Sequence, residues 1–163
     1  MNIFAKNEEE TKKIGLAIGE NLNSPVVIYL TGDLGTGKTY ISKGIAEGLK
    51  IKEDITSPTF TLINEYKNDK YHLYHLDLYR LNSLSSVLDL GIEDFVSEND
   101  SVTIIEWYEK LENYKLSKNF IEIKIFYNEN GRDFIIELDN YDKKNELEKR
   151  IKEIVNTWNW YFW

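Results

Sequence analysis

The chain has 163 residues and a net charge of −8, with 42% hydrophobic and 29% charged residues. This length is typical of one domain, so we expect residues 1–163 to fold as a single unit. Phosphate contacts with basic side chains supply most of the affinity of proteins that bind nucleic acid unaided, and the acidic balance opposes that role. The chain has no cysteine, which excludes disulfides, thiolate metal sites and a thiol nucleophile.

No targeting or membrane segment is expected. The first residues, MNIFAKNEEETKK, lack the basic and apolar blocks of a signal peptide. No apolar run approaches the roughly 20 residues that span a bilayer. We therefore expect a cytoplasmic protein that does not contact membranes.

The first half of the chain alternates helical and strand patterns. Residues 8–22 are predicted to form an amphipathic helix with acids in its first turn. The apolar run 26–30 is typical of a strand buried on both faces of a parallel sheet. The further elements expected in this half are a glycine-rich loop, a helix over about 38–49, strands at 61–67 and 71–79, a short helix from Ser83 to Leu90 that stops at Gly91, and a buried strand at 102–106.

The second half indicates an antiparallel addition. Residues 120–127 and 132–139 both alternate in polarity and flank an Asn-Gly turn, which predicts a hairpin. A last helix is expected from near Asp142, with an apolar stripe of Leu147, Ile151, Ile154, Val155 and Trp158. The order of elements predicts an α/β sandwich of three layers, with central parallel strands and antiparallel additions that include the C-terminal hairpin.

Residues Gly32 to Thr39 match the P-loop motif G-x-x-x-x-G-K-[ST] at every fixed position, and they lie between a buried-type strand and a helix. The expected three-layer α/β sandwich is therefore a P-loop fold. Glycines in such a loop let backbone N–H groups converge on phosphate oxygens at a helix N-terminus. Lys38 is expected to reach the β- and γ-phosphates, and the Thr39 hydroxyl to ligate Mg²⁺. The residues expected to contact the nucleotide here are Asp33, Leu34, Gly35, Thr36, Gly37, Lys38, Thr39 and Tyr40.

A site of this kind needs an acid at the end of a neighbouring strand to hold Mg²⁺ or orient water. Glu106 ends the apolar strand 102–106, which is the arrangement expected of a metal-side acid. Asp77 ends another strand, although aspartate at a strand end is also ordinary turn chemistry. Together with Lys38, these two acids are the candidate catalytic residues.

Other side chains leave two interpretations open. Ser57 and Thr59 lie in a Ser-Pro-Thr-Phe segment that either senses the γ-phosphate or simply opens a strand. Trp107 is either a core residue or a neighbour of the nucleotide. His72 and His75 are three apart on an expected strand and so point to opposite faces, which disfavours a metal pair.

The segments around these residues resemble the TsaE family, formerly YjeE, of bacterial ATPases in tRNA threonylcarbamoyladenosine synthesis. The resemblance rests on the P-loop, on Ser57-Pro58-Thr59-Phe60, on His75-Leu76-Asp77-Leu78-Tyr79-Arg80 and on Ile105-Glu106-Trp107, over about residues 8–112. It implies an ATPase that uses ATP and Mg²⁺, with Thr39 and Glu106 on the metal side and Asp77 supporting hydrolysis. It also implies Ser57 and Thr59 in a switch segment and Trp107 beside the site.

The resemblance further implies a partner, the TsaB–TsaD pair, whose threonylcarbamoyl transfer to tRNA the ATPase supports. The protein without its partners is expected to hydrolyse ATP slowly, because Arg80 is the only arginine in the nucleotide-proximal half of the sequence. No strong direct tRNA binding is expected. ATP is favoured over GTP, since the Asn-Lys-x-Asp segment usual in GTPases does not occur.

Two features depart from the family pattern. Tyr108 follows Trp107 where a small residue is expected, which affects local packing more than chemistry. The aromatic tail, residues 157–163, either packs in the core or contacts a partner or a second copy of the chain.

Two rival functions are a P-loop kinase for small molecules and a nucleotide-dependent scaffold without turnover. A kinase would be expected to carry an arginine-bearing lid, which three arginines in the whole chain disfavour. A scaffold would bind Mg²⁺-ATP tightly without hydrolysing it, even with partners present.

Overall fold

A computed structural model describes residues 1–111 and 114–158, apart from the side chain of Trp158, and in it seven strands form one mixed sheet in the order β1-β7-β6-β2-β5-β4-β3. The strands are β1 (Asn2–Ala5), β2 (Val26–Thr31), β3 (Ile63–Lys67), β4 (His72–Asp77), β5 (Ser101–Glu106), β6 (Phe120–Asn128) and β7 (Gly131–Glu137). The four central strands β6, β2, β5 and β4 are parallel, while β3, β7 and β1 pair antiparallel with their neighbours. The predicted α/β sandwich with central parallel strands and a C-terminal hairpin is confirmed.

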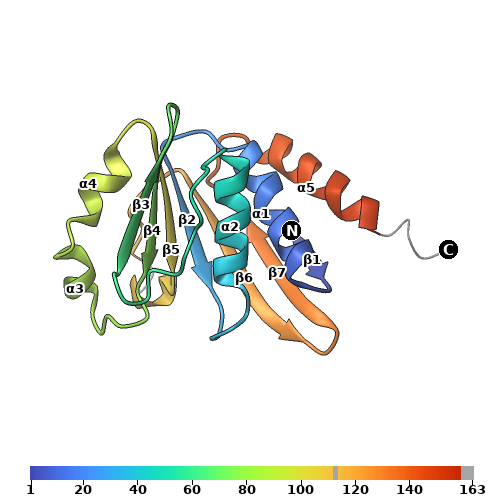
Figure 1. The fold of residues 1–163 in the computed structure, drawn as a ribbon, viewed down its shortest axis with the longest axis horizontal. Helices are drawn as coiled ribbons and strands as arrows, with labels where there is room; N and C mark the ends of the chain where they lie inside the picture. The colour runs from blue at the N-terminus through green and yellow to red at the C-terminus, as the bar shows by residue number, and fades with distance from the viewer. Residues whose placement is uncertain (112–113, 159–163) are drawn as a thin grey trace.

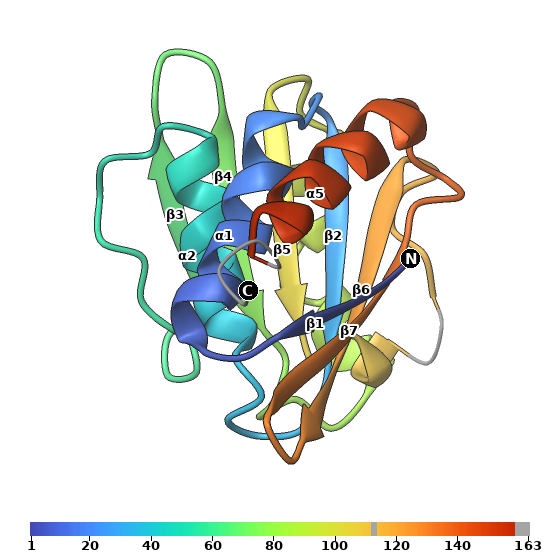
Figure 2. The same cartoon turned by 90° about the vertical axis from the view of Figure 1, so that its right-hand side faces the viewer.

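Helices cover both faces of the sheet, as Figures 1 and 2 show. The helices are α1 (Glu8–Glu20), α2 (Lys38–Gly48), α3 (Leu84–Leu88), α4 (Ile92–Ser97) and α5 (Lys144–Trp158), with a 3₁₀ turn η1 (Tyr108–Leu111). One face is covered by α1, α2 and α5 and the other by α3 and α4. In the described parts of the chain, no helix is long and apolar enough to cross a membrane.

The central strands are apolar on both faces because each face has its own core. On β2, Ile28 and Leu30 pack with the α1–α2 side, whereas Val27 and Tyr29 pack with the α3–α4 side. All four side chains are buried. This two-sided burial is the reason that the run 26–30 reads as continuously hydrophobic rather than alternating.

Helices α1 and α2 pack unusually closely through glycine. A Cβ atom added to Gly15 would lie 2.3 Å from the Ile41 carbonyl oxygen, and one added to Gly44 would lie 2.1 Å from the Lys12 carbonyl oxygen. Gly19 and Gly48 repeat the same close approach one turn further along the pair. The absence of side chains at these positions lets the two backbones touch, and this contact fixes α2, whose N-terminus carries the P-loop.

Several element boundaries differ from the sequence predictions. β4 ends at Asp77 rather than at residue 79, because the Asp77 carboxylate accepts the Tyr79 N–H at 2.9 Å and turns the chain. β3 begins at Ile63 rather than at residue 61, since Leu62 has a φ of 67° that no strand residue adopts. The last helix begins at Lys144, two residues later than expected.

Three elements were not predicted at all, namely β1, α4 and the 3₁₀ turn η1. β1 is a four-residue edge strand that pairs only with β7, and so short a segment carries little periodicity. α4 begins just after Gly91, whose left-handed backbone (φ 71°) joins it to the turn that follows α3. The expected helix stop at Gly91 is therefore correct, but a second helix follows it directly.

The predicted apolar stripe of the last helix is seen as far as the structure describes it. Leu147 and Ile151 are buried, and Ile154 and Val155 are half-buried against the same core. The predicted burial of Trp158 and the proposed contact made by the tail at 159–163 lie outside the described residues.

Tyr108 shows how the chain accommodates its departure from the small residue expected there. Its ring is 97% buried, with its centroid 4.2 Å from that of Tyr29, and Lys115 Nζ lies 4.1 Å from the ring centroid. Tyr29 in turn accepts the Leu116 N–H on its hydroxyl at 2.8 Å, and burial raises its pKa to about 12. Tyr108 thus packs into the core on the α3–α4 side, away from the P-loop face of the sheet.

Candidate nucleotide-binding site

The P-loop follows β2 at the carboxyl edge of the parallel strands and leads directly into α2. Gly35 (φ 80°) and Gly37 (φ 106°) adopt left-handed backbone conformations that a side chain would strain. Gly37 is the N-cap of α2, and its carbonyl accepts the Ile41 N–H at 3.1 Å. The loop therefore brings free backbone N–H groups to a helix N-terminus, where anions bind.

Lys38 lies folded against its own loop. Its Nζ donates to the Gly32 carbonyl at 2.6 Å and to the Asp33 carbonyl at 2.9 Å, and lies 4.0 Å from the centre of the Trp107 ring. Burial lowers the pKa of Lys38, while the nearby carboxylates, Glu106 first among them, act in the opposite direction. In the described part of the chain this buried ammonium has carbonyl partners but no ion pair.

The adjacent strands β4 and β5 bring the two predicted acids together. Asp77 and Glu106 are direct register partners in the parallel pair, and each is only 3% exposed. β5 also pairs with β2, so Glu106 lies beside the start of the P-loop. The Thr39 hydroxyl is 3.5 Å from Glu106 Oε1, the contact expected of two groups that share a cation.

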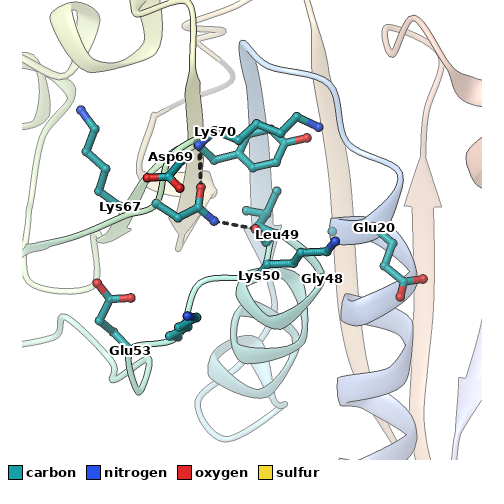
Figure 3. Close-up of a pocket in the computed structure, with 12 residues that line it drawn as sticks. Glu20, Gly48, Leu49, Lys50, Glu53, Lys67, Asp69 and Lys70 are labelled. Carbon is teal, nitrogen blue, oxygen red and sulfur yellow. Dashed lines mark hydrogen bonds between the residues drawn. The ribbon is translucent and has the colours of Figure 1, made fainter.

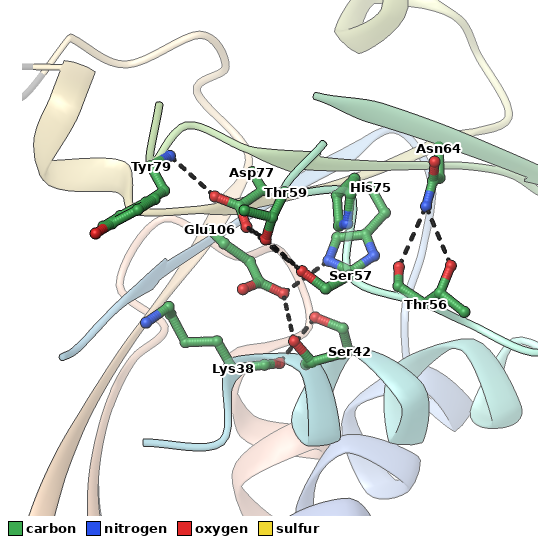
Figure 4. A network of polar contacts seen from close by, with 12 residues as sticks. Lys38, Ser42, Thr56, Ser57, Thr59, Asn64, His75, Asp77, Tyr79 and Glu106 are labelled. Carbon is green, nitrogen blue, oxygen red and sulfur yellow. Dashed lines mark hydrogen bonds and ion pairs between the residues drawn. The ribbon is translucent and has the colours of Figure 1, made fainter. Parts of the chain in front are cut away.

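Asp77 is held by the segment predicted to act as a switch. Thr59 donates its hydroxyl to Asp77 Oδ2 at 2.6 Å, and Ser57 lies 3.5 Å from the same oxygen. The two hydroxyls are 2.7 Å apart, and Pro58 between them is buried. The segment therefore turns both hydroxyls toward the end of β4 (Figure 4).

Trp107 lies directly beside the site. Its φ of 62° places the backbone in the left-handed region, which is costly for a bulky residue. The ring packs on Lys38 and on Tyr79, whose ring centroid is 4.9 Å away. The ring lies beside the P-loop lysine and also packs against the core on the α3–α4 side, so both interpretations left open by the sequence describe part of its surroundings.

His75 is a site residue that the sequence analysis missed. Its ring is completely buried, and Nε2 lies 2.8 Å from Glu106 Oε1 (Figure 4). The sequence offered one signal, because His75 lies two residues before Asp77 and therefore on the same face of β4. His72 contacts Glu98 and Glu65 instead, so the two histidines do face apart as predicted.

Arg80 is the only arginine in the nucleotide-proximal half of the sequence, but the fold brings a second arginine to the P-loop. Arg132 on β7 crosses Gly37, where an added Cβ would lie 3.2 Å from Arg132 Nε. Its cross-strand partner Tyr127 donates its hydroxyl to the Leu34 carbonyl at 2.9 Å. The hairpin thus supports the P-loop from behind, a contact between distant segments that no local pattern announces.

Neither arginine lines the hollow in front of the P-loop. Arg80 is exposed, and its guanidinium lies 4.4 Å from the centre of the Phe60 ring. The hollow has a volume of about 210 Å³ and is lined by Leu34, Gly35, Gly37, Lys38, Thr39, Tyr40, Ser57, Thr59, Asp77, Tyr79, Glu106 and Trp107. All the predicted candidates except Asp33 and the buried Thr36 line this hollow. The Thr36 hydroxyl instead donates to the Asp33 carbonyl at 2.9 Å within the loop.

A larger hollow of about 640 Å³ lies elsewhere, between the carboxyl ends of α1 and α2 and the β3–β4 turn (Figure 3). Its charged lining mixes both signs, with Lys50, Lys52, Lys67, Lys70, Glu20, Glu53 and Asp69. The carboxyl ends of helices disfavour anions. Size alone therefore does not make it the nucleotide site, and the smaller hollow has the convergent chemistry.

The residues present fit a nucleotide phosphate and Mg²⁺. The buried ammonium of Lys38, which donates to two carbonyls of its own loop, would gain an anion in front of the α2 N-terminus. Mg²⁺ typically takes one or two protein oxygens and completes its shell with phosphates and water. Thr39 and Glu106 supply that number, and among the described residues no cluster of three or more histidine or acidic side chains forms an all-protein metal cage.

In this chain a buried parallel strand leads through the loop into a helix, and acids end the next two strands in the sheet order. This arrangement defines the P-loop nucleotide-binding class. The family model for the Threonylcarbamoyl adenosine biosynthesis protein TsaE matches residues 5–134. The chain therefore belongs to the TsaE family, and the resemblance noted in the sequence is confirmed.

Curated relatives and a solved structure agree with this assignment. The tRNA threonylcarbamoyladenosine biosynthesis protein TsaE of Nostoc sp. is 43% identical over 79% of this chain and 80% of its own length. The protein of that name from Bacillus subtilis is 42% identical over 65% of each chain. The crystal structure of Bacillus subtilis YdiB matches with a TM-score of 0.71 and 29% identity over 96% of this chain and 95% of its own.

Proposed function

We propose that this protein binds Mg²⁺-ATP and hydrolyses it, and that hydrolysis supports threonylcarbamoyl modification of tRNA adenosine by the TsaB–TsaD pair. The observation that carries the proposal is the convergence of the P-loop lysine, the Thr39–Glu106 pair and the Thr59–Asp77 pair on one hollow. Membership of the TsaE family supplies the pathway, and the named partner follows from the resemblance.

Different residues of the site would serve ATP binding and ATP hydrolysis. Lys38 would leave its carbonyl partners and offset charge on the β- and γ-phosphates. Thr39 and Glu106 would hold Mg²⁺, which neutralises charge that develops during phosphoryl transfer. Asp77, which accepts from Thr59, would orient a water molecule.

The same arrangement favours slow hydrolysis by the isolated protein. Fast P-loop hydrolysis usually requires an arginine or an equivalent group at the γ-phosphate, and neither Arg80 nor Arg132 lines the hollow. Ser57 and Thr59 lie in the loop between α2 and β3, which a partner could rearrange. The missing positive charge or the rearrangement would then come from the partner.

Steady-state phosphate release, measured with and without the TsaB–TsaD pair, tests the proposal. The pair is expected to raise ATP turnover about tenfold or more, a change of about 1.4 kcal/mol in the barrier. Glu106→Ala, assayed in the same complex, controls for contaminating ATPases. Tight Mg²⁺-ATP binding without turnover in the complex would instead indicate a scaffold, and phosphate transfer to a nucleoside or sugar would indicate a kinase.

A further inference from the structure

A buried hydrogen bond joins the two central strands behind the proposed metal site. His75 Nε2 and Glu106 Oε1 are 2.8 Å apart, and the two side chains are 0% and 3% exposed. A carboxylate oxygen can only accept, so Nε2 carries the proton of this bond. His75 therefore donates to the carboxylate that also lies 3.5 Å from the Thr39 hydroxyl.

Among the described residues, the second ring nitrogen of His75 makes no polar contact that would account for a histidine at this position. His75 Nδ1 is buried and has no hydrogen-bond partner in the described part of the chain. Glu106 is thus the one polar contact that this ring makes there, and an apolar side chain of similar size could fill the same space. The polar ring is explained by its bond to Glu106 rather than by packing.

The bond holds the oxygen of Glu106 that also faces the Thr39 hydroxyl. Oε1 lies 2.8 Å from His75 Nε2 and 3.5 Å from the Thr39 hydroxyl, whereas no hydrogen bond reaches Oε2 within residues 1–111 and 114–158. A side-chain carboxyl group without such a contact rotates freely between orientations. His75 holds Oε1 from strand β4 and so restricts the orientation of the carboxylate before a cation binds.

We propose that His75 is a positioning residue, which orients the Glu106 carboxylate toward the Mg²⁺ that accompanies the nucleotide. The inference rests on the proposed function, because it assigns the support of the same site. Hydrogen-bonded partners of metal-ligating side chains typically contribute about 10- to 100-fold to metal affinity or activity. His75 does not itself contact the nucleotide or the cation.

The test compares two substitutions of similar length and opposite hydrogen-bonding capacity. His75→Gln keeps an N–H that reaches Glu106, and His75→Met fills the site without a donor. His72→Gln is the matched control, since His72 is on the same strand, is only 14% exposed and also bonds to a glutamate, Glu98. Calorimetry of ADP binding in excess Mg²⁺ and in EDTA gives, for each variant, the gain in affinity due to Mg²⁺.

His75→Met is expected to lose about tenfold or more of the Mg²⁺-dependent gain, with its affinity in EDTA unchanged. His75→Gln and His72→Gln should keep the gain to within about threefold. In phosphate release with the TsaB–TsaD pair, kcat should fall in the methionine variant and be rescued in the glutamine variant. Because the gain is a ratio within one variant, a lowered melting temperature does not imitate the effect.

An unchanged Mg²⁺-dependent gain in His75→Met, an equal loss in EDTA, or a loss of the same size in His75→Gln would overturn the inference. If His75→Met does not fold, His75→Asn replaces it, since its shorter amide does not reach Glu106, and the same outcomes apply. A wild-type protein with no Mg²⁺-dependent gain would contradict the proposed function itself. A normal wild-type gain with an unaffected methionine variant would contradict only the role of His75.

Discussion

Lys38 and Thr39 are neighbours in the P-loop but have different partners, so their substitutions should have different signatures. Lys38 Nζ contacts the loop carbonyls and is placed to meet phosphate, whereas the Thr39 hydroxyl faces Glu106. Lys38→Ala should abolish ATP binding in Mg²⁺ and in EDTA alike, because the charge that offsets the phosphates is lost. Thr39→Ala should weaken binding mainly in Mg²⁺, and Thr39→Ser should restore it.

Calorimetry with and without EDTA separates these two effects. An equal loss for Thr39→Ala in both conditions would contradict its role at the metal.

Substitution of Asp77 or Glu106 is expected to slow ATP hydrolysis more than it weakens ATP binding. Asp77→Ala and Glu106→Ala are each expected still to bind ATP, Glu106→Ala with a smaller gain in affinity from Mg²⁺, and to hydrolyse it about 100-fold more slowly, which is the usual contribution of a group that orients water or of a metal-side acid. Single-turnover phosphate release in the presence of the TsaB–TsaD pair measures the loss.

Asp77→Asn refines the result for that position. The amide oxygen can still accept from one of the two donors, the Thr59 hydroxyl now on Oδ2 or the Tyr79 N–H now on Oδ1, and the side chain has no negative charge. Full turnover in this variant would mean that Asp77 serves only to shape the turn at the end of β4.

At the scale of elements, the close pair α1–α2 is what holds the P-loop helix in place. A methyl group at Gly44 would meet the Lys12 carbonyl oxygen at 2.1 Å and the Leu16 nitrogen at 2.9 Å, and both are backbone atoms that cannot rotate away. Gly44→Ala should therefore force the helices apart and lower stability by about 1–3 kcal/mol. For a chain of this size, each kcal/mol corresponds to a fall of roughly 2–4 °C in the melting temperature.

Lys43→Ala is the adjacent control. Lys43 is half-exposed and pairs at 3.6 Å with the exposed Asp54, an interaction worth about 0–1 kcal/mol. A melting temperature for Gly44→Ala that matches Lys43→Ala would show that the two helices can separate at little cost.

At the scale of the whole molecule, the net charge of −8 disfavours direct binding of tRNA. With 28 acidic and 20 basic side chains, the surface suits docking on another protein better than gripping tRNA. The isolated protein is expected to bind tRNA no better than non-specifically, with Kd values of about 10⁻⁴–10⁻⁶ M on the scale measured for DNA-binding proteins. Fluorescence anisotropy with labelled tRNA measures this affinity, and tight binding that survives about 0.2 M salt would contradict it.

The sequence by itself determined the elements whose signals are local. The run 26–30, the motif Gly32 to Thr39 and the start of α2 at Lys38 are consecutive, so one stretch of chain specifies strand, loop and helix together. The Asn130-Gly131 turn likewise joins two adjacent alternating segments. Asp77 and Glu106 could be proposed because each ends an apolar strand.

The tertiary structure alone decided which of these strand ends meet. The register of β4 against β5 places Asp77 opposite Glu106 and brings His75 within 2.8 Å of it, although 31 residues separate the histidine from the glutamate. Likewise, Arg132 reaches Gly37 only because β7 folds back along β6, and β6 pairs with β2. Such contacts depend on sheet order and register, which are set by the packing of the whole core rather than by any local run of residues.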